Sequence, residues 1–394
     1  MALARVASDR SQTELGPSRL SDVALLFLRL GATAFGGPAV HIALMEDEVV
    51  RRRRWLSPER FLDMMGAANL IPGPSSSELA IFIGYEKAGL LGLLVAGVCF
   101  VLPAALITLA LAWVYVQFGS LPSIAGLLYG IKPVVIAIVL QALFGLAPKA
   151  INKSRFRGTL GVLACIVAAA GVNALIILIG AGLVSVISHM VLTRDGNPRC
   201  KALLAFGPVA MTKGAALPLA FGLGPLFLTF LKMGSVVFGS GYVLLAFLRA
   251  DLVERLHWMT EAQLIDAIAV GQITPGPVFT TATFIGYLLA GTPGAIVATL
   301  AIFLPGFVLV AAIRPLVARV RRFRSAATFL DGVNVASMSL MAVVTMQLGR
   351  AALTDWITVF LAAVSAVLLV RFKVSSSWLV AGGALVGVVT HGIR

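Results

Sequence analysis

Long apolar stretches separated by short polar loops dominate the pattern of the chain. Two clear examples run from Leu90 to Phe118 and from Asn173 to Leu192. A helix needs about 20 apolar residues to span the hydrocarbon core of a bilayer, so such stretches predict transmembrane helices. They are continuously apolar, whereas the strands of a membrane β-barrel alternate between apolar and polar residues. The pattern therefore predicts an all-α polytopic membrane protein.

The same pattern occurs twice, at an offset of about 203 residues. The matched segments are Phe35-Gly36-Gly37 with Phe238-Gly239-Ser240, Trp55 with Trp258, Asp63 with Asp266, and Pro72-Gly73-Pro74 with Pro275-Gly276-Pro277. After a one-residue deletion the match continues to Gly130 and Gly332. Because this spacing holds over roughly 100 residues, we interpret the chain as a duplication of two homologous halves. The predicted parts are an N-terminal tail (1–22), a first transmembrane repeat (23–193), a linker (194–213) and a second transmembrane repeat (214–394).

Basic residues occupy opposite places in the two repeats. The loop at 119–122 has no charge, whereas its counterpart at 314–324 contains five arginines. Conversely, four basic residues lie within 149–157, where the second repeat has only Arg350 and Asp355. Basic loops face the cytoplasm, so equivalent loops are expected on opposite sides of the cell inner membrane. This predicts an inverted topology, which is typical of secondary transporters.

Composition narrows the class of protein. Hydrophobic residues make up 59% of the chain and charged residues 12%, which excludes a cytosolic enzyme and a secreted domain. The net charge of +14 lies mostly in short loops, where it sets topology. The remaining positive charge is available to attract an anion, and we expect no nucleic-acid partner. The three cysteines show no paired spacing, and the tail lacks the apolar core of a cleavable signal peptide, so we expect no metal site, no cofactor and no leader.

Each repeat carries a Pro-Gly-Pro segment between two short helices. Ser57-Pro58 predicts a helix start in the first repeat, and Thr260 with Gln263 predicts a capping box in the second. The helices on either side of Pro72-Gly73-Pro74 would be about 21 Å and 18 Å long, shorter than the roughly 30 Å hydrocarbon core. The segment is therefore either a broken helix that crosses or a hairpin that enters and returns. The basic clusters at 51–54 and 149–157 favour a re-entrant hairpin with Pro-Gly-Pro at its tip.

The hairpin tips are the predicted substrate site. A helix that begins after Pro-Gly-Pro presents free N–H groups and the positive end of its dipole, which binds anions. Hydroxyl groups add donors without fixed charge, so two tips that meet from opposite sides would hold a tetrahedral oxyanion. The alternative is a proline break between packed helices, with the hydroxyls bonded back to the helix. The predicted binding residues here are Gly36, Gly37, Gly73, Ser75, Ser76, Ser77, Gly239, Gly276, Thr280 and Thr281.

Four charged residues complete the candidate site. Arg29 and Lys232 occupy equivalent positions on the glycine-bearing helices and are candidate substrate ligands, unless they extend to the interface. Lys132 lies about 14 Å inside its predicted helix and is a candidate ligand or counter-charge. Glu78 lies one turn into the first half-helix, where a carboxylate opposes an anion unless it is protonated. We therefore treat Glu78 as a proton-coupling candidate, with helix-dipole complementation or an ion pair as the alternative.

These motifs together resemble the bacterial chromate ion transporter family. The resemblance rests on Phe35-Gly36-Gly37-Pro38, Pro72-Gly73-Pro74-Ser75, Phe238-Gly239-Ser240-Gly241-Tyr242 and Pro275-Gly276-Pro277. The two-copy layout is similar to the long, two-domain form. The resemblance implies a transporter and not an enzyme, with export of chromate, sulfate as a structural analogue, coupling to the proton-motive force and chromate resistance. Short members contain one half and act in pairs, so a homodimer is open for the long form.

Two other transport functions fit the same residues. One is an uptake transporter for sulfate or another divalent oxyanion, because chromate and sulfate share shape and charge. The other is an anion channel, which lacks alternating access. An intramembrane serine hydrolase is disfavoured because Val278 replaces Ser75 in the second copy and no histidine is suitably repeated.

Overall fold

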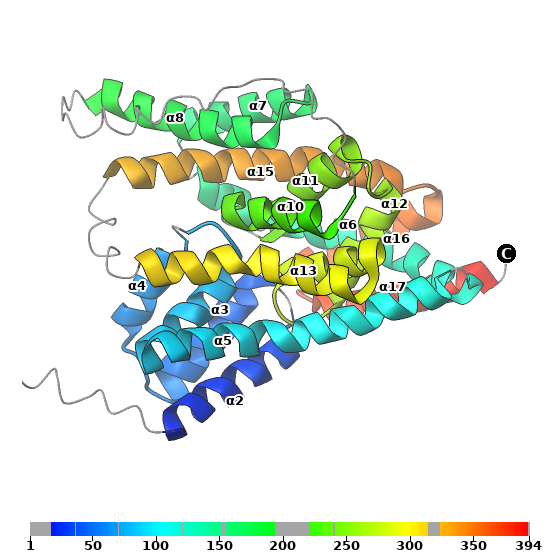
Figure 1. Cartoon of the computed structure of the whole chain (residues 1–394). Helices are drawn as coiled ribbons and strands as arrows, with labels where there is room; N and C mark the ends of the chain where they lie inside the picture. The colour runs from blue at the N-terminus through cyan, green and yellow to red at the C-terminus, as the bar shows by residue number, and fades with distance from the viewer. Residues whose placement is uncertain are drawn as a thin grey trace, which may run out of the picture.

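The computed structural model describes residues 17–35, 37–69, 71–119, 121–151, 154–193, 221–238, 241–313 and 324–392. Within these ranges the regular structure is entirely helical (Figure 1). Five helices of the described chain are long and apolar enough to span a membrane, over Ser75–Phe118, Ile124–Pro148, Ala174–Val191, Val278–Ala312 and Ala327–Ala352. This confirms the prediction of an all-α polytopic membrane protein. The predicted linker lies outside the described residues.

The two repeats contain the same order of elements. In the first repeat these are α2 (Pro17–Thr33), α3 (Pro38–Glu46), the π-helical turn η1 (Asp47–Arg52), α4 (Pro58–Ala68), α5 (Ser75–Phe118), α6 (Pro122–Ile151), α7 (Arg155–Ala169) and α8 (Ala174–Thr193). In the second they are α10 (Leu223–Val236), the short turn η3 (Gly241–Val243), α11 (Leu244–Leu248), the π-helical turn η4 (Arg249–Arg255), α12 (Glu261–Ile273), the 3₁₀ turn η5 (Val278–Thr280), α13 (Thr281–Ile313), α15 (Arg324–Ala352), α16 (Trp356–Arg371) and α17 (Ser376–Gly392).

The helix starts before the two Pro-Gly-Pro segments follow the predicted capping signals. The Ser57 hydroxyl accepts a hydrogen bond from the Arg60 N–H, with Pro58 in the first helical turn of α4. Thr260 and Gln263 form a complete capping box at the start of α12. These bonds satisfy N–H groups that have no partner within the helix. The sequence therefore predicted both helix starts correctly.

The helix that follows each Pro-Gly-Pro is interrupted at one matching position. In α5 the break is at Ala88 and Gly89, where Gly89 has a φ of 62°. The second copy, Ala290 and Gly291 in α13, has the same backbone shape, with a φ of 61° at Gly291. A Cβ at Gly84 would collide with the Gly92 backbone and the Ala96 side chain. The chain thus folds back at Gly89, because residues eight apart in a straight helix lie about 12 Å apart.

The two halves are interlocked through their later helices. Helix α6 packs against α16 and α17 of the other half, and its counterpart α15 packs against α7 and α8. Small residues permit the close approach, since a Cβ at Gly130 would overlap the α17 backbone and one at Gly332 would overlap that of α8. Helices α5 and α13 pack side by side between the halves, and Figure 1 shows the long part of α5 after its break running from left to right and the long part of α13 after its break running from right to left. The two helices therefore run in opposite directions.

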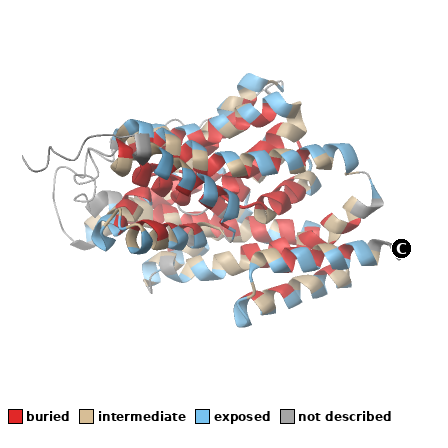
Figure 2. Ribbon diagram, turned by 90° about the horizontal axis from the view of Figure 1, so that it is seen from below, coloured by how far each residue is buried: buried red, intermediate tan, exposed pale blue. Residues whose placement is uncertain are grey.

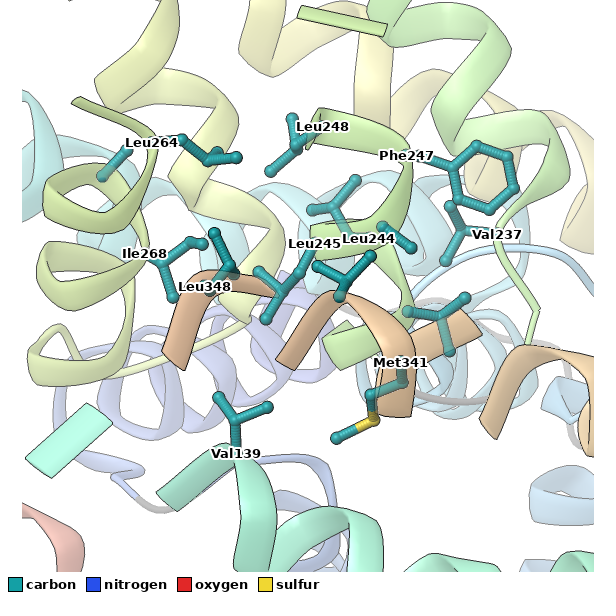
Figure 3. Close-up of a cluster of buried hydrophobic side chains, with 14 of the residues drawn as sticks. Val139, Val237, Leu244, Leu245, Phe247, Leu248, Leu264, Ile268, Met341 and Leu348 are labelled. Atoms are coloured by element: carbon teal, nitrogen blue, oxygen red, sulfur yellow. The ribbon is translucent and has the colours of Figure 1, made fainter. Parts of the chain in front are cut away.

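The core lies between the repeats and the outer helix faces are apolar. A buried cluster joins α10, α11, α12 and α15, and Figure 3 shows its residues Leu245, Leu248, Leu264 and Leu348. Figure 2 shows burial concentrated in the interior, with exposed stripes along the peripheral helices. Large apolar side chains on these stripes, such as Leu102 and Leu106 of α5, are 45% and 55% exposed. In water this would be unfavourable, but in a bilayer such faces contact lipid.

Candidate substrate site at the two Pro-Gly-Pro segments

The two Pro-Gly-Pro segments exchange backbone hydrogen bonds between the halves. The Gly73 N–H donates to the Val237 carbonyl at 2.6 Å, and the Gly276 N–H donates to the Ala34 carbonyl at 2.9 Å. Both glycines have positive φ, 131° and 88°, a conformation that residues with a side chain rarely adopt. Each acceptor lies where the first helix of the opposite half ends. The glycines that the sequence singled out therefore join the halves through their amides.

The helices that begin at the two tips carry different chemistry at one matched position. Glu78 lies in the first turn of α5, is fully buried, and has no hydrogen-bond partner on either carboxylate oxygen among the described residues. Its carboxylate lies against Gly73 and beside Gly306 of the other half. In the second copy Thr281 takes this place, and its hydroxyl donates to the Val278 carbonyl at 2.7 Å. The counterpart of Gly306 is Ala104, which packs against Gly276.

A cavity of about 810 Å³ lies beside both tips. Its wall combines α3 with the tip residues of both halves, the C-terminal half of α6 and the connection between α16 and α17. Of the predicted binding residues described by the structure, Gly37, Ser75 and Gly276 line this cavity. The structure thus brings residues of both Pro-Gly-Pro segments to one hollow, as a shared substrate site requires.

The cavity wall is rich in neutral hydrogen-bonding groups. Amide side chains come from Asn69, Gln141 and Gln272, and hydroxyls come from Ser75 and Thr274. Further hydroxyls come from the serines at 375–377. Among the described residues that form this wall, Lys373 is the one with a formal charge. The wall can therefore surround an anion with donors without placing a carboxylate next to it.

The other predicted tip residues make internal contacts. Ser76 contacts buried His41 of α3: His41 Nδ1 lies 3.3 Å from the Ser76 hydroxyl, and its Nε2 lies 3.0 Å from the Ala34 carbonyl, which also accepts from the Gly276 N–H. The Ser77 hydroxyl is buried and unpartnered within the described chain. The Thr280 hydroxyl donates back to the Pro277 carbonyl at 2.9 Å. At Thr280 and Thr281 the hydroxyls thus bond back to the helix, which is the alternative interpretation of the motif.

The repeated cations are both held in ion pairs. Arg29 lies 2.6 Å from Glu48, and Lys232 contacts Asp251 at the equivalent position of the second repeat. Both carboxylates are buried and lie on the π-helical turns η1 and η4. Glu48 also pairs with Arg52 and Arg53, and Asp251 also pairs with Arg255. The positive charge of Arg29 and Lys232 is therefore balanced locally.

Lys132 also has a carboxylate partner. Its ammonium lies 2.9 Å from Asp266 of α12, and the Tyr115 hydroxyl donates to the other Asp266 oxygen at 3.0 Å. This contact joins the first half to the second, and it places Lys132 as a counter-charge. Gly36 and Gly239 lie outside the described residues. No group of His, Cys, Asp and Glu side chains in the described part of the chain is arranged to hold a metal ion.

Sequence analysis missed two groups of residues that the structure brings into play. The first is the amide pair Asn69 and Gln272, each three residues before a Pro-Gly-Pro segment. The second is the carboxylate pair Glu48 and Asp251. Both pairs obey the offset of 203 residues, so the duplication itself was the signal that could have found them. They were missed because only the chemical type, amide or carboxylate, is kept between the copies.

The family of the chain follows from comparison with known proteins. The family model described as "Chromate transporter" matches residues 21–186 and again residues 224–388. The chain belongs to the chromate transporter family. Because one model matches twice, the chromate transporter architecture here consists of two homologous halves, as the internal repeat predicted. No solved structure matches the chain.

Several relatives in the chromate transporter family cover most of the chain. A "Chromate transport protein" of Cupriavidus metallidurans is 33% identical over 383 residues, which covers 94% of this chain and 93% of the relative. A "Probable chromate transport protein" of Synechococcus elongatus is 32% identical and covers 85% and 86%. A "Chromate transport protein" of Pseudomonas aeruginosa is 30% identical and covers 82% and 80%. These names describe the relatives, and they favour a transport function for this chain over an enzymatic one.

Proposed function

We propose that this protein is a secondary transporter that exports chromate across the cell inner membrane by alternating access, coupled to the proton-motive force, and so gives chromate resistance. Sulfate is the expected competing substrate because it has the same shape and charge. Family membership supports chromate as the substrate. Residues of both halves form the cavity, which supports a substrate site within one chain.

One observation carries the transport mechanism: the cavity is open in one repeat while the equivalent place in the other repeat is packed. Val40 of α3 lines the cavity and is 39% exposed, whereas its counterpart Val243 is 0% exposed. In the first repeat the cavity separates α3 from α6. In the second repeat α11 packs directly on α15. A transporter that closes one access path while opening the other has this asymmetry, whereas an open channel does not.

The distribution of basic residues assigns the open side of the cavity to the cytoplasm. The part of α6 that lines the cavity leads to the basic segment at 149–157. The connection between α16 and α17, which also lines it, contains Lys373 and directly follows Arg371 at the end of α16. Both segments would face the cytoplasm under the positive-inside rule. The described conformation is then open to the compartment from which an exporter takes its substrate.

Inverted repeats account for this arrangement. The opposite directions of α5 and α13 support the proposal that equivalent segments enter the membrane from opposite sides, with a re-entrant hairpin in each half (Figure 1). Labelling tests the topology in intact cells. Cysteines introduced at Ser120 and Arg321 should react with an impermeant thiol reagent from opposite sides. Reaction from the same side would contradict the inverted arrangement and leave the halves parallel.

Glu78 is the proposed proton carrier. A buried carboxylate without a partner is far more costly charged than neutral, so it takes up a proton when the tip is dry. Ser75, one turn earlier on α5, lines the cavity, so opening of this tip would bring Glu78 into contact with water. Protonation of Glu78 and access to the cavity would thereby be linked, as proton antiport requires.

Energetics favour export as the direction. A dianion that leaves a cell with a negative interior gains about 2.3 kcal/mol per charge per 100 mV, or about 4.6 kcal/mol for both charges. Uptake of sulfate, the alternative function, would have to overcome the same amount. Proton entry in exchange for chromate adds a further driving force. The geometry offers this through Glu78 in one half only.

Chromate uptake into inverted membrane vesicles tests the function. With the vesicle interior acidified, we expect accumulation of chromate above its external concentration, competition by sulfate, and loss of accumulation when the proton gradient is collapsed. Passive equilibration that no proton gradient alters would favour the anion channel. Accumulation only in right-side-out vesicles would favour the uptake transporter. Vesicles from cells without the protein are the control.

A further inference from the structure

We propose that the side-chain amides of Asn69 and Gln272 form a repeat-related pair of donors that binds the oxygens of the transported oxyanion and sets the affinity for it. The two residues occupy equivalent positions, each three residues before a Pro-Gly-Pro segment. Both line the cavity beside the tips. The inference rests on the proposed function, because it names the residues that bind the substrate of that same site.

Gln272 gives the first line of support. It lies in the last turn of α12, and its Nε2 atom is buried with no hydrogen-bond partner in the described chain. Nearly all buried donors in proteins have a partner, so an unpartnered one in a cavity wall indicates a missing acceptor. An anionic oxygen is the strongest acceptor that a neutral amide can meet. Because Gln272 also lines the cavity, an oxyanion bound there would satisfy this donor once the amide turns toward the cavity.

The surroundings of the pair give the second line of support. Asn69 ends α4 as its C-cap, and Ser75 lies close by in the chain on the far side of Pro-Gly-Pro. Thr274 and Gly276 of the second copy line the same cavity as Gln272. The described residues of the wall include no carboxylate and one cation, Lys373. An anion without protons, such as chromate or sulfate, suits a wall of donors of this kind.

The amide in the open repeat, Asn69, is more exposed than the amide in the packed repeat, Gln272. Asn69 is exposed and Gln272 has a buried donor atom. With the first repeat open, an incoming oxyanion would meet Asn69 first and Gln272 deeper in the wall. The two residues are therefore expected to contribute together, and each is expected to matter for affinity.

Isosteric substitutions test the pair. Asn69→Asp and Gln272→Glu keep the size of the side chain but replace its NH₂ donor with an oxygen that repels an anion. In the vesicle assay each should raise the KM for chromate about tenfold or more and raise the inhibition constant of sulfate in parallel, because hydrogen bonds to charged groups have this strength. The maximal rate should change much less. Asn69→Gln and Gln272→Asn, which keep the donor, should recover part of the affinity.

Gln263→Glu is the matched control. It makes the same chemical change on the same helix, at the outer end of α12, where the Gln263 oxygen accepts from the Thr260 N–H and a carboxylate can do so equally well. We expect unchanged KM and maximal rate. Sulfate and chromate should also protect the purified wild type and Gln263→Glu against thermal unfolding, and protect Asn69→Asp and Gln272→Glu much less.

The outcomes separate this inference from the proposed function. If both substitutions leave the KM and the protection by sulfate unchanged while chromate transport continues, the amide pair is refuted and the function stands. A lower maximal rate at unchanged KM also refutes the pair, since the amides would then act only in packing or movement. If the wild type does not transport chromate yet sulfate protects it in an amide-dependent way, the function is wrong and the oxyanion site remains.

Discussion

The open first repeat and the packed second repeat have nearly the same backbone design but differ in what they expose. Both have a π-helical turn bearing an ion-paired carboxylate, a capped helix, a Pro-Gly-Pro tip and a helix broken at an Ala-Gly pair. The first repeat places α3 against a cavity, and the second buries α11 on α15. The difference between the two repeats therefore lies in packing, which is what the proposed alternating access requires.

A second difference lies at the tips, and it is one of sequence. Glu78 lies beside Gly306 in one tip, and Thr281 lies in the other tip, where Ala104 stands in place of glycine. A Cβ at Gly306 would be in ordinary van der Waals contact with Glu78, at 3.7 Å from its Cγ. The repeats could in principle swap their open and packed conformations, but the difference between Glu78 and Thr281 is fixed by the sequence. Under the proposed function, the protein would combine a symmetric mechanism for access with a single proton site.

The largest expected effect comes from locking the packed repeat. Leu245 of α11 and Leu348 of α15 lie in one buried cluster (Figure 3). Their counterparts Ile42 and Leu146 line the cavity. In a background without Cys99, Cys165 and Cys200, Leu245→Cys with Leu348→Cys should react with a short thiol cross-linker and lose all chromate transport. Cleavage of the cross-linker should restore transport, as measured in inverted vesicles.

The pair Ile42→Cys with Leu146→Cys is the complementary test. It should cross-link only when the first repeat closes, and chromate should change the fraction that does so. If the Ile42–Leu146 pair never reacts, while the Leu245–Leu348 pair can be cross-linked without loss of transport, the asymmetry is a fixed feature and alternating access fails.

Removing the proton site should have the next largest effect. Glu78→Gln keeps the size of the side chain but cannot exchange a proton, so proton-driven accumulation of chromate should fall at least tenfold. Downhill movement of chromate should persist, because the cavity and its donors remain. Accumulation in inverted vesicles with an acidic interior, compared with efflux down a chromate gradient, measures both.

Glu59→Gln is the control for this change, because Glu59 is exposed on α4 before the same Pro-Gly-Pro segment. It should transport like the wild type. Retention of full proton-driven accumulation by Glu78→Gln would move the coupling site elsewhere in the chain. Thr281→Val extends the comparison, since loss of the second-copy hydroxyl should leave coupling intact.

The two tip glycines should differ in their tolerance of a methyl group. A Cβ at Gly276 would lie 2.7 Å from the Ala104 side chain and 3.1 Å from the Gly31 carbonyl, on backbone with a φ of 88°. Gly276→Ala should therefore lower the amount of folded protein several-fold. Gly73 is also on strained backbone, with a φ of 131°, but its added Cβ would meet only the end of the Glu78 side chain, so Gly73→Ala should lose less folded protein than Gly276→Ala while impairing coupling. Membrane content and vesicle transport together measure this difference.

Ala104→Gly recreates at the second tip the space that Gly306 provides at the first. The double variant Gly276→Ala with Ala104→Gly should recover part of the folded protein. No recovery would show that backbone strain, and not the contact with Ala104, causes the defect. Equal transport and expression of Gly73→Ala and Gly276→Ala would contradict the difference between the tips.

The smallest effects are expected at the repeated ion pairs. Lys232→Gln leaves Asp251 with Arg255, whereas Arg29→Gln leaves Glu48 with both Arg52 and Arg53. We expect a loss of about 1–2 kcal/mol of stability for Lys232→Gln and less for Arg29→Gln, with little change in the KM for chromate. Thermal unfolding of the purified variants and vesicle kinetics measure the two quantities. A raised KM without loss of stability would instead support the sequence-based hypothesis that these cations attract the substrate.

Sequence alone predicted the helical membrane fold and the duplication, because hydropathy and repeated motifs are local signals. It also located the breaks at Pro72 to Pro74 and the helix starts at Ser57 and Thr260, since proline and capping residues act on their own backbone. Gly73, Gly276 and Ser75 were chosen on the same basis. The structure places Ser75 and Gly276 in the cavity wall and Gly73 in the contact between the halves.

The sequence could not predict which residues of one half contact which residues of the other. Lys132 pairs with Asp266 and the Gly73 amide bonds to Val237, and each contact joins segments more than 130 residues apart. Which repeat is open is also a property of packing over the whole molecule. The partners of Arg29 and Lys232 were easier to predict, since Glu48 and Asp251 lie at matched positions in the two repeats. That Glu48 and Asp251 pair with these cations was learned only from the folded structure.

The exchange of helices between the halves also constrains the order in which the protein is made. The ribosome completes α6 long before α16 and α17, the helices that cover it. Until α16 and α17 are synthesised, the polar residues on α6, such as Gln141, must face lipid or an insertion factor. Because α17 packs along α6, loss of α17 would leave α6 uncovered. The C-terminal segment is thus the step on which assembly of the whole transporter depends.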